Sequence, residues 1–393
     1  MAVMLKRLSH ATRTVVAAAL LTVAAHALAQ DLVEGHPDTY VVQEGDTLWS
    51  IAGKFLQRPW LWPEIWQANP QIANPHAIYP GDVISLAYGE RTLATVEPGP
   101  RLASASPVNA IPLSEIEPFL KDLRVVAGFE HLPYVVALEE DRLRASSGSV
   151  AYVRGLTDAR PGERFTVMRP TVKYSYRDRA GLCCDLHQVS DLTHRGKETM
   201  DWQRFWSNAY FPESGSAELG YELMRVTAGT VTRGAVSGIE VATLLLDESG
   251  YEVRPGDRLV RVDAQPYDLT FFPHAPTVQH DYGRLQVMAV ADGLTTAGPR
   301  SVVALSGGTN QGIDNGTVFS MWRVGSNVVD RVEYPFTRSE DTVGFEAKVR
   351  LPDEYAGHVM VFRTFDNVSY GLVMDSIRPT QVGYELKHPD APY

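Results

Sequence analysis

The chain has 393 residues, of which 44% are hydrophobic and 21% are charged, and its formal net charge is −11. This composition is typical of a globular protein with room for two or three domains. The negative charge argues against nucleic acid and against an anionic membrane surface as partners, because both would repel it. Two cysteines are present, Cys183 and Cys184, and because they are adjacent they exclude a disulfide framework.

Residues 1–29 predict a secretory signal peptide. Three basic residues precede the apolar run 15–25, and the small-residue pattern Ala27-Leu28-Ala29 follows as a cleavage signal. The apolar run is shorter than the roughly 20 residues that a membrane-spanning helix needs. We therefore expect cleavage after Ala29 and export of a soluble protein.

Composition divides the remaining chain into regions. Residues 30–88 form a compact first region, and residues 89–112 are rich in Ala, Ser, Pro and Gly, which predicts a flexible linker. A middle region, 113–216, and a C-terminal region, 217–393, consist of runs of Val, Tyr, Thr and Phe broken by Gly and Pro, as is typical of strands. The predicted fold class is α+β: a small β-α-α-β module, the linker, then a mainly antiparallel β-rich C-terminal region.

The compact region predicts its four elements in order. A β-branched and aromatic strand at 39–42 leads into a turn, and Asp46 or Thr47 caps the helix that follows. A second helix at 63–69 begins with proline, which is favoured in a first turn. A return strand at 83–86 completes a unit of about fifty residues, which is near the lower limit for a single core.

Four of the seven tryptophans fall within residues 45–70. Trp49 and Trp66 lie at helical positions, and we expect both in the core, where large rings replace aliphatic packing. Trp60 and Trp62 belong to an insertion between the two helices, and three hypotheses remain for them. They fasten the helix connection, stack on a sugar, or contact a partner. We favour the first hypothesis.

The β-rich region opens with one helical segment, 113–126. Ser114 followed three residues later by Glu117 is a capping pattern. Pro118 predicts that this helix is short or begins near the proline.

A turn-and-strand unit then recurs, with a glycine after a turn residue and before a strand-like run. The unit occurs at 160–169, 254–263, 314–324 and 355–365. A longer similarity between 237–262 and 301–323 favours duplicated hairpins in one sheet system or barrel.

The alternation within one of these strands predicts which face is buried. Val260 and Val262 share one face, and Leu259 and Arg261 share the other. We predict that the valine face forms core, because the opposite choice would bury Arg261. Three arginines near strand ends are expected to be solvated: Arg169, Arg323 and Arg363.

Catalytic and metal-binding patterns are weak. The 11 histidines are scattered, without the spacing of a zinc-ligand pair on one helix face. Neither cysteine adjoins a helix start that would present a nucleophile. A glycosidase needs two placed carboxylates, and any of the 47 acidic residues could serve. We predict no enzyme, no catalytic residue, no metal ion and no cofactor.

Residues Thr39–Leu86 resemble a LysM domain. The opening YVVQEGDTLWSIA, the pair Asn69-Pro70 and the ending IYPGDVISL stand in the family's order and separation. The resemblance implies a module that binds N-acetylglucosamine-containing glycans, mainly peptidoglycan, through backbone N–H groups in a groove between two loops. Carried onto this chain, the glycan-binding residues are Gly45, Asp46, Thr47, Leu48, Asn69, Pro70, Ile78, Tyr79, Pro80 and Gly81.

The whole layout is similar to the family of type IV pilus secretin-associated proteins, through the runs RPWLWPEIW and NPHAIYPGD. The run VVALSGGTNQGIDNGTVFSMWRV is similar to the C-terminal domain of flagellar FlgT-type proteins. These resemblances imply a periplasmic anchor that ties an outer-membrane secretin to the cell wall, with copies arranged as a homo-oligomeric ring. The alternatives are a generic wall-binding structural protein without a secretin partner, or a peptidoglycan hydrolase targeted by its LysM domain.

Overall fold

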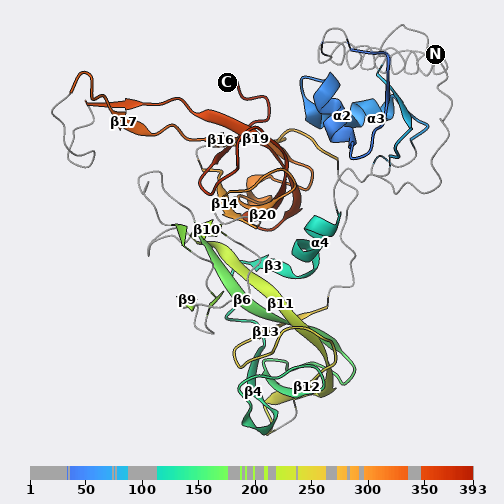
Figure 1. Cartoon of the computed structure of the whole chain (residues 1–393). Coiled ribbons are helices and arrows are strands. Elements are labelled where there is room, and N and C mark those ends of the chain that lie inside the picture. Colours follow the sequence, from blue (N-terminus) through green and yellow to red (C-terminus); the bar gives the residue numbers. More distant parts are fainter. Residues whose placement is uncertain are drawn as a thin grey trace, which may run out of the picture. The chain divides into compact units, whose positions relative to one another are not determined.

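The structure is a computed structural model of the chain (Figure 1). It describes residues 33, 36–72, 75, 78–86, 113–175, 186–187, 191–192, 198–199, 208–210, 218–235, 238–262, 272–280, 284–291, 296–334 and 347–392. The expected signal peptide, the expected linker and both cysteines lie outside these residues. Within them, no helix combines the length and the apolar character that crossing a bilayer requires.

The chain divides into two compact units. Unit 1 comprises residues up to 113 together with Phe272–His274, and unit 2 comprises 114–271 and 275–393. The division of the later chain at residue 216 does not separate sheets, because strands from both sides of that position pair within unit 2.

Unit 1 has the predicted β-α-α-β order. Its elements are β1 (Thr39–Val41), α2 (Leu48–Phe55), the 3-10 helix η1 (Pro59–Leu61), α3 (Trp62–Gln67) and β2 (Val83–Ser85). Strands β1 and β2 pair antiparallel, with Tyr40 opposite Ile84. Thr47 is the N-cap of α2, because its hydroxyl accepts the Ser50 N–H while the Ser50 hydroxyl accepts the Thr47 N–H.

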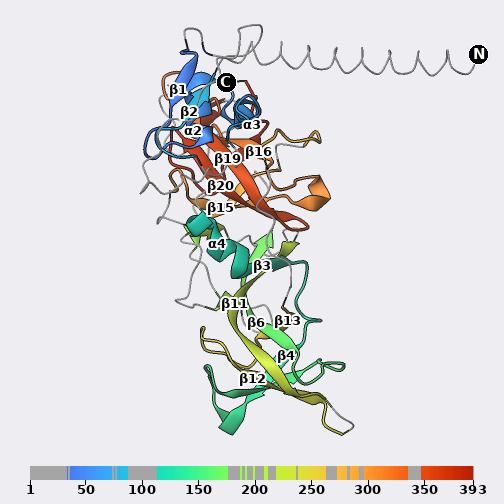
Figure 2. The ribbon, with the colours of Figure 1, turned by 90° about the vertical axis from the view of Figure 1, so that its right-hand side faces the viewer.

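The first part of unit 2 is a sheet that closes on itself. In the described residues the strand order is β12-β5-β4-β13-β6-β11-β3, and β12 also pairs with β11. The strands are β3 (Leu123–Val126), β4 (Tyr134–Leu138), β5 (Val150–Arg154), β6 (Arg164–Ser175), β11 (Glu218–Arg233), β12 (Val241–Leu246) and β13 (Arg258–Arg261). The long strands β6 and β11 run side by side (Figure 2), and the enclosed core contains Phe165, Val167 and Leu244.

The second part is a larger sheet with the order β21-β16-β19-β20-β15-β14-β10-β7 among the residues described. These strands are β7 (Leu186–His187), β10 (Asn208–Tyr210), β14 (Val287–Val290), β15 (Val302–Ser306), β16 (Val318–Arg323), β19 (Glu354–Thr364), β20 (Val368–Ser376) and β21 (Glu385–Lys387). Leu386 donates its N–H to the Leu285 carbonyl at 2.9 Å, so β21 also lies against the start of β14. This sheet therefore curls around its own core, which includes Phe319 and Val361.

Shorter elements complete unit 2. They are α4 (Leu113–Lys121), the 3-10 helices η2 (Glu139–Asp141) and η3 (Thr309–Gln311), the pair β8 (Asp191–Leu192) and β9 (Glu198–Thr199), and the hairpin β17 (Asn327–Val329) with β18 (Lys348–Arg350). Every strand pairing in the described part of the chain is antiparallel, as the sequence predicts.

As predicted for Pro118, the helix is short: α4 runs through the proline but ends at Lys121, and strand β3 begins at Leu123. The missing donor of Pro118, the sixth of the nine helical residues, is a loss of one hydrogen bond inside the helix. It is offset by the burial of Ile116, Phe119 and Leu120 on the side of the helix that packs inward.

The predicted buried face of β13 was also wrong. Leu259 is 1% exposed and belongs to the core, whereas Val262 is 46% exposed. Arg261 is not buried with Leu259, because it is the last residue of the strand and its guanidinium extends over the ring of Phe165. A long side chain can bury its stem while its charged head reaches water.

Two of the three arginines predicted to be solvated are engaged inside the protein. Arg169 is buried and donates two hydrogen bonds to the Asp257 carboxylate, at 2.9 and 3.0 Å. Burial raises the pKa of Asp257, although the bonds from Arg169 oppose that rise. Arg363 donates to the carbonyls of Phe119 and Leu120 at the C-terminal end of α4. Arg323 is exposed and pairs with Glu354, as predicted for a solvated strand end.

The recurring glycine unit forms a turn in three of its four predicted positions. Gly162, Gly256 and Gly316 have φ values of 94°, 98° and 99°, which favour glycine. The fourth glycine, Gly357, lies inside β19, where a Cβ would come within 2.2 Å of the Asp375 carbonyl oxygen. It is a site of close strand approach instead of a turn.

The two sheets of unit 2 are joined through Glu222 of β11. Its buried carboxylate accepts hydrogen bonds from Tyr174 of β6 and Tyr370 of β20, each at 2.7 Å, and from Thr171 at 3.0 Å. Burial, reinforced by the charge of Glu222, raises the pKa of both tyrosines well above 10, so both hydroxyls keep their protons and act as donors. Glu222, Thr171, Tyr174 and Tyr370 form a cluster in which donors from two sheets hold the charge of one carboxylate.

We expect Tyr370→Phe to lower the free energy of unfolding of unit 2 by about 1.5–3 kcal/mol, because it removes one donor to a buried charge but keeps the ring. Urea unfolding followed by far-ultraviolet circular dichroism measures the change. Tyr251→Phe, at an exposed position, is the control and should change stability by less than about 0.5 kcal/mol. Equal effects of the two substitutions would contradict the role of the cluster.

The β17–β18 hairpin is fixed at its base by Asp353. This carboxylate accepts the Gly325 N–H at 3.0 Å, Lys387 Nζ at 2.7 Å and Arg350 Nη2 at 3.1 Å. Burial by itself would raise the pKa of Asp353, but these three bonds outweigh it and lower the pKa from 3.8 to about 2. The charged form is therefore stabilised in the folded state.

A depressed pKa contributes stability above the unfolded-state value and loses it as the pH falls toward the folded-state value. We expect Asp353→Asn to lower the free energy of unfolding by about 2 kcal/mol at pH 5, and by progressively less as the pH approaches 2. Urea unfolding across this range measures the difference from the unsubstituted chain. Asp366→Asn, at an exposed position, controls for the loss of one charge. A loss for Asp353→Asn that does not vary with pH would count against this account.

Candidate functional site

Two turns of unit 1 lie side by side and carry most of the predicted glycan-binding residues. Backbone bonds join them, since Val42 donates to the Asp82 carbonyl and Gly81 donates to the Val42 carbonyl, each at 2.9 Å. We call them the twin turns, 43–46 and 79–82. The structure thus brings together the two loops that the sequence predicts to form a groove.

The twin turns share one construction, visible as Gln-Glu-Gly-Asp and Tyr-Pro-Gly-Asp. The third residue of each is a glycine with positive φ, 86° at Gly45 and 95° at Gly81. The aspartate at the fourth position accepts the N–H of the first residue. That distance is 2.9 Å from Gln43 to Asp46 and 3.0 Å from Tyr79 to Asp82. Both turns are therefore fixed locally by their own residues.

The Asp46 carboxylate accepts two further hydrogen bonds. Tyr40 donates its hydroxyl at 2.7 Å, and Lys54 donates its ammonium at 2.8 Å. Burial by itself would raise the pKa of Asp46, but the bonds from Lys54, Gln43 and Tyr40 together lower it. The sequence analysis did not identify Tyr40 or Lys54. The Asp46 side chain holds the turn and does not face outward.

Asn69 has a similar structural role at the end of α3. Its side-chain amide donates to the carbonyls of Ile65 at 2.7 Å and Ser85 at 2.8 Å, and its oxygen accepts the Ser85 N–H at 2.7 Å. The residue is fully buried. It therefore ties the second helix to the return strand and holds the loop between them in place.

The ten predicted site residues divide by exposure. The side chains of Asp46, Leu48, Asn69 and Ile78 are buried and shape the site from inside. Gly45 and Pro70 are exposed, and Thr47, Tyr79, Pro80 and Gly81 are half-buried. A ligand can reach these six positions, which offer backbone groups, a tyrosine ring and small or flat side chains.

The tryptophans do not form an exposed platform. Trp49, Trp60 and Trp62 are buried at 4%, 4% and 2% exposure, which agrees with the structural hypothesis for the insertion. Trp66 is half-buried and donates its indole N–H to the Ile72 carbonyl at 2.7 Å. The ring of Phe272, which belongs to the same unit, stacks on Trp66 at 5.5 Å and lies 5.9 Å from Trp62. These rings contribute to packing and are not free to stack on a sugar from both faces.

Comparison with known proteins agrees with this geometry. Residues 40–87 match the LysM domain family. A 60-residue stretch is 38% identical to the uncharacterized protein YqbP of Bacillus subtilis, and the alignment covers 13% of this chain and 27% of that relative. The LysM domain supports binding of peptidoglycan or a related carbohydrate. The match covers unit 1, so it carries no information about the β-rich unit 2.

We expect Asn69→Ala to lower the free energy of unfolding of unit 1 by about 2–4 kcal/mol, because it leaves buried backbone groups of Ile65 and Ser85 unpaired. Tryptophan fluorescence during urea unfolding measures this, since four of the seven tryptophans lie in unit 1. Gln67→Ala, at an exposed position of α3, is the control and should have little effect. A stability unchanged by Asn69→Ala would refute the proposed tie between helix and strand.

Proposed function

We propose that this protein is a non-catalytic, periplasmic cell-wall anchor. Its LysM domain binds N-acetylglucosamine-containing strands of peptidoglycan, and its β-rich unit holds an outer-membrane partner, which the resemblance suggests is the secretin of a type IV pilus. The observation that carries the proposal is the pair of twin turns, locally fixed and joined through Val42, with exposed or half-buried backbone at Gly45, Tyr79 and Gly81.

The geometry of the twin turns favours binding over hydrolysis. Glycoside hydrolysis needs one carboxyl group that gives up a proton and another that acts as base or nucleophile. Asp46 is held in its charged form by Lys54 and Tyr40, and Asp82 accepts the Tyr79 N–H. Both carboxylates of the site are thus engaged in turn structure.

An anchor of this kind would bind the cell wall more tightly when several copies bind together. Each LysM–glycan contact involves a small surface, so a single copy would bind weakly. Copies arranged as a ring around a pore would bind the wall as a multivalent array, in which the effective concentration of each next contact is high. Such a ring would distribute the load that a retracting filament places on its pore.

Pelleting with purified sacculi tests the wall-binding half of the proposal. We expect residues 31–393 to pellet with the sacculi and a chain lacking residues 31–88 to stay in solution. Tyr79→Ala should weaken retention by about tenfold, which corresponds to about 1.4 kcal/mol, because it removes a ring from the edge of the site. Tyr251→Ala, in unit 2, is the matched control.

If both the complete and the shortened chain pellet, the wall-binding surface lies outside the LysM domain and the proposed division of roles is wrong. For the partner, detergent-solubilised outer membranes should yield the secretin with the shortened chain as well as with the complete one. Loss of the secretin on removal of residues 31–88 would contradict the assignment of the partner to unit 2.

A further inference from the structure

A groove lies along the first sheet in unit 2. It consists of two adjoining hollows, of about 520 and 210 Å³, that share Arg124, Val260 and Arg261 in their walls. We call it the β3–β13 groove, after the strands that carry these shared residues. One hollow extends toward the loops at 131–133 and 155–159, and the other crosses β6 toward α4. Its size is within the range of ligand sites in proteins.

The larger hollow has an apolar floor. Val126, Leu132, Leu156, Phe165 and Leu259 all line it. Leu259 and Phe165 are also members of the core of the closed sheet, so this floor is rigid and preformed. A ligand that enters it can bury apolar groups without reorganising the fold.

The walls of the groove are cationic in a chain that is acidic overall. Six lysine and arginine residues line it against two acidic residues, whereas the whole chain carries a net charge of −11. The cations are Lys121, Arg124, Arg164, Arg225, Arg261 and Arg363, and the acids are Asp158 and Glu248.

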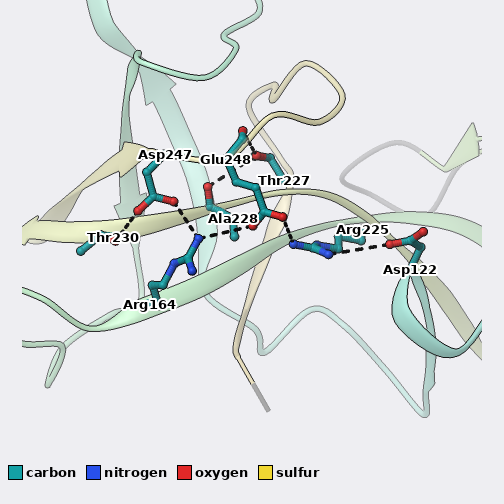
Figure 3. A network of polar contacts seen from close by, with 8 residues as sticks. All are labelled: Asp122, Arg164, Arg225, Thr227, Ala228, Thr230, Asp247 and Glu248. Atoms are coloured by element: carbon teal, nitrogen blue, oxygen red, sulfur yellow. Dashed lines mark hydrogen bonds and ion pairs between the residues drawn. The ribbon is translucent and has the colours of Figure 1, made fainter. Parts of the chain in front are cut away.

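Two cations of the smaller hollow, Arg164 and Arg225, are engaged in internal pairs (Figure 3). The Glu248 carboxylate lies 2.6 Å from Arg225 and 3.4 Å from Arg164, and Asp247 accepts a bond from Arg164 at 3.1 Å. Asp122 lies 3.9 Å from Arg225 on its other side. This network stiffens one wall of the smaller hollow.

Arg261, at the junction of the two hollows, is placed to contact a ligand carboxylate. Its side chain is 71% exposed, its guanidinium lies 5.7 Å from the centre of the Phe165 ring, and its distance to Glu163 is 3.6 Å, too long for a strong bond. A guanidinium that stacks on an aromatic ring keeps its in-plane N–H donors for a carboxylate. Arg124 lines the same junction from β3.

We propose that the β3–β13 groove binds an extended segment of a partner protein that combines acidic and apolar side chains. A carboxylate meets Arg124 and Arg261 at the junction, and apolar side chains enter the hollow floored by Phe165 and Leu259. A segment that occupies both hollows must be elongated, because they adjoin only at the shared residues. Such a segment would have a run of apolar and acidic residues in an extended chain.

The rim favours a peptide over an anionic lipid. Thr157 and Asp158 line the larger hollow and carry oxygens that can accept the N–H groups of a peptide backbone. An acyl chain has no such donors. The inference deepens the anchoring proposal, since it names the surface with which unit 2 holds a partner, and it does not depend on glycan binding.

A random octapeptide display library, panned on the complete mature chain, tests this. We expect enrichment of sequences that combine Asp or Glu with Val, Leu or Phe, and at least a tenfold loss of binding for an enriched peptide on Arg124→Glu/Arg261→Glu. Fluorescence anisotropy measures the affinities, which should fall as salt rises. Arg142→Glu/Arg144→Glu makes the same change of charge at exposed positions outside the groove and should bind normally.

Three outcomes would overturn the proposal: no enrichment, a consensus without acidic residues, or equal binding by both double variants. Binding of the chain to phosphatidylglycerol vesicles that Arg124→Glu/Arg261→Glu abolishes, without peptide enrichment, would assign the groove to lipid. Circular dichroism and sacculus pelleting of each variant serve as controls for folding. Because pelleting depends on unit 1, a failure of wall binding and a failure of the groove are distinguished in the same set of variants.

Discussion

The buried carboxylate of Glu222 is the constraint on which the arrangement of unit 2 depends. A charge in the interior is tolerated only when donors surround it, and here the donors come from β6 and from β20, which belong to different sheets. Separating the sheets would leave the charge without a donor from one side. The same junction contains Phe119 of α4 against the ring of Tyr370, and Arg363 at the last carbonyls of α4. The helix and the two sheets are thus held together by specific polar contacts as well as by the burial of apolar surface.

The same type of Gly-Asp turn occurs in both units. The Gly-Asp turns at 43–46 and 79–82 have a counterpart at 254–257, where Asp257 accepts the Arg254 N–H at 2.9 Å. In unit 1 two such turns shape the candidate glycan site. The aspartate side chain is buried in all three turns, and it receives Lys54 at Asp46 and Arg169 at Asp257. The turns differ in what packs against them.

The candidate glycan site and the β3–β13 groove share a general property, in that both rest on rigid supports. Asn69 and Asp46 fix the loops of the first, and the closed sheet fixes the floor of the second. A preformed site loses little conformational entropy on binding. The proposed anchor would benefit from this, because each contact would then retain more of its interaction free energy.

By itself the sequence determined the features that are set within a few residues. Glycine at the third turn position, aspartate at the fourth and threonine before a helix fix the backbone locally, so the β-α-α-β order and the glycine turns could be predicted. The tertiary structure decided which side chains are buried, since burial depends on partners far away in the chain. The alternation of residues in β13 could not show that Arg261 ends its strand over the ring of Phe165. The position of Arg169 in the sequence could not show that its partner would be Asp257, 88 residues later. The groove likewise exists because the closed sheet and its loops bring Arg124, Leu156 and Arg261 together, and no local pattern encodes that proximity.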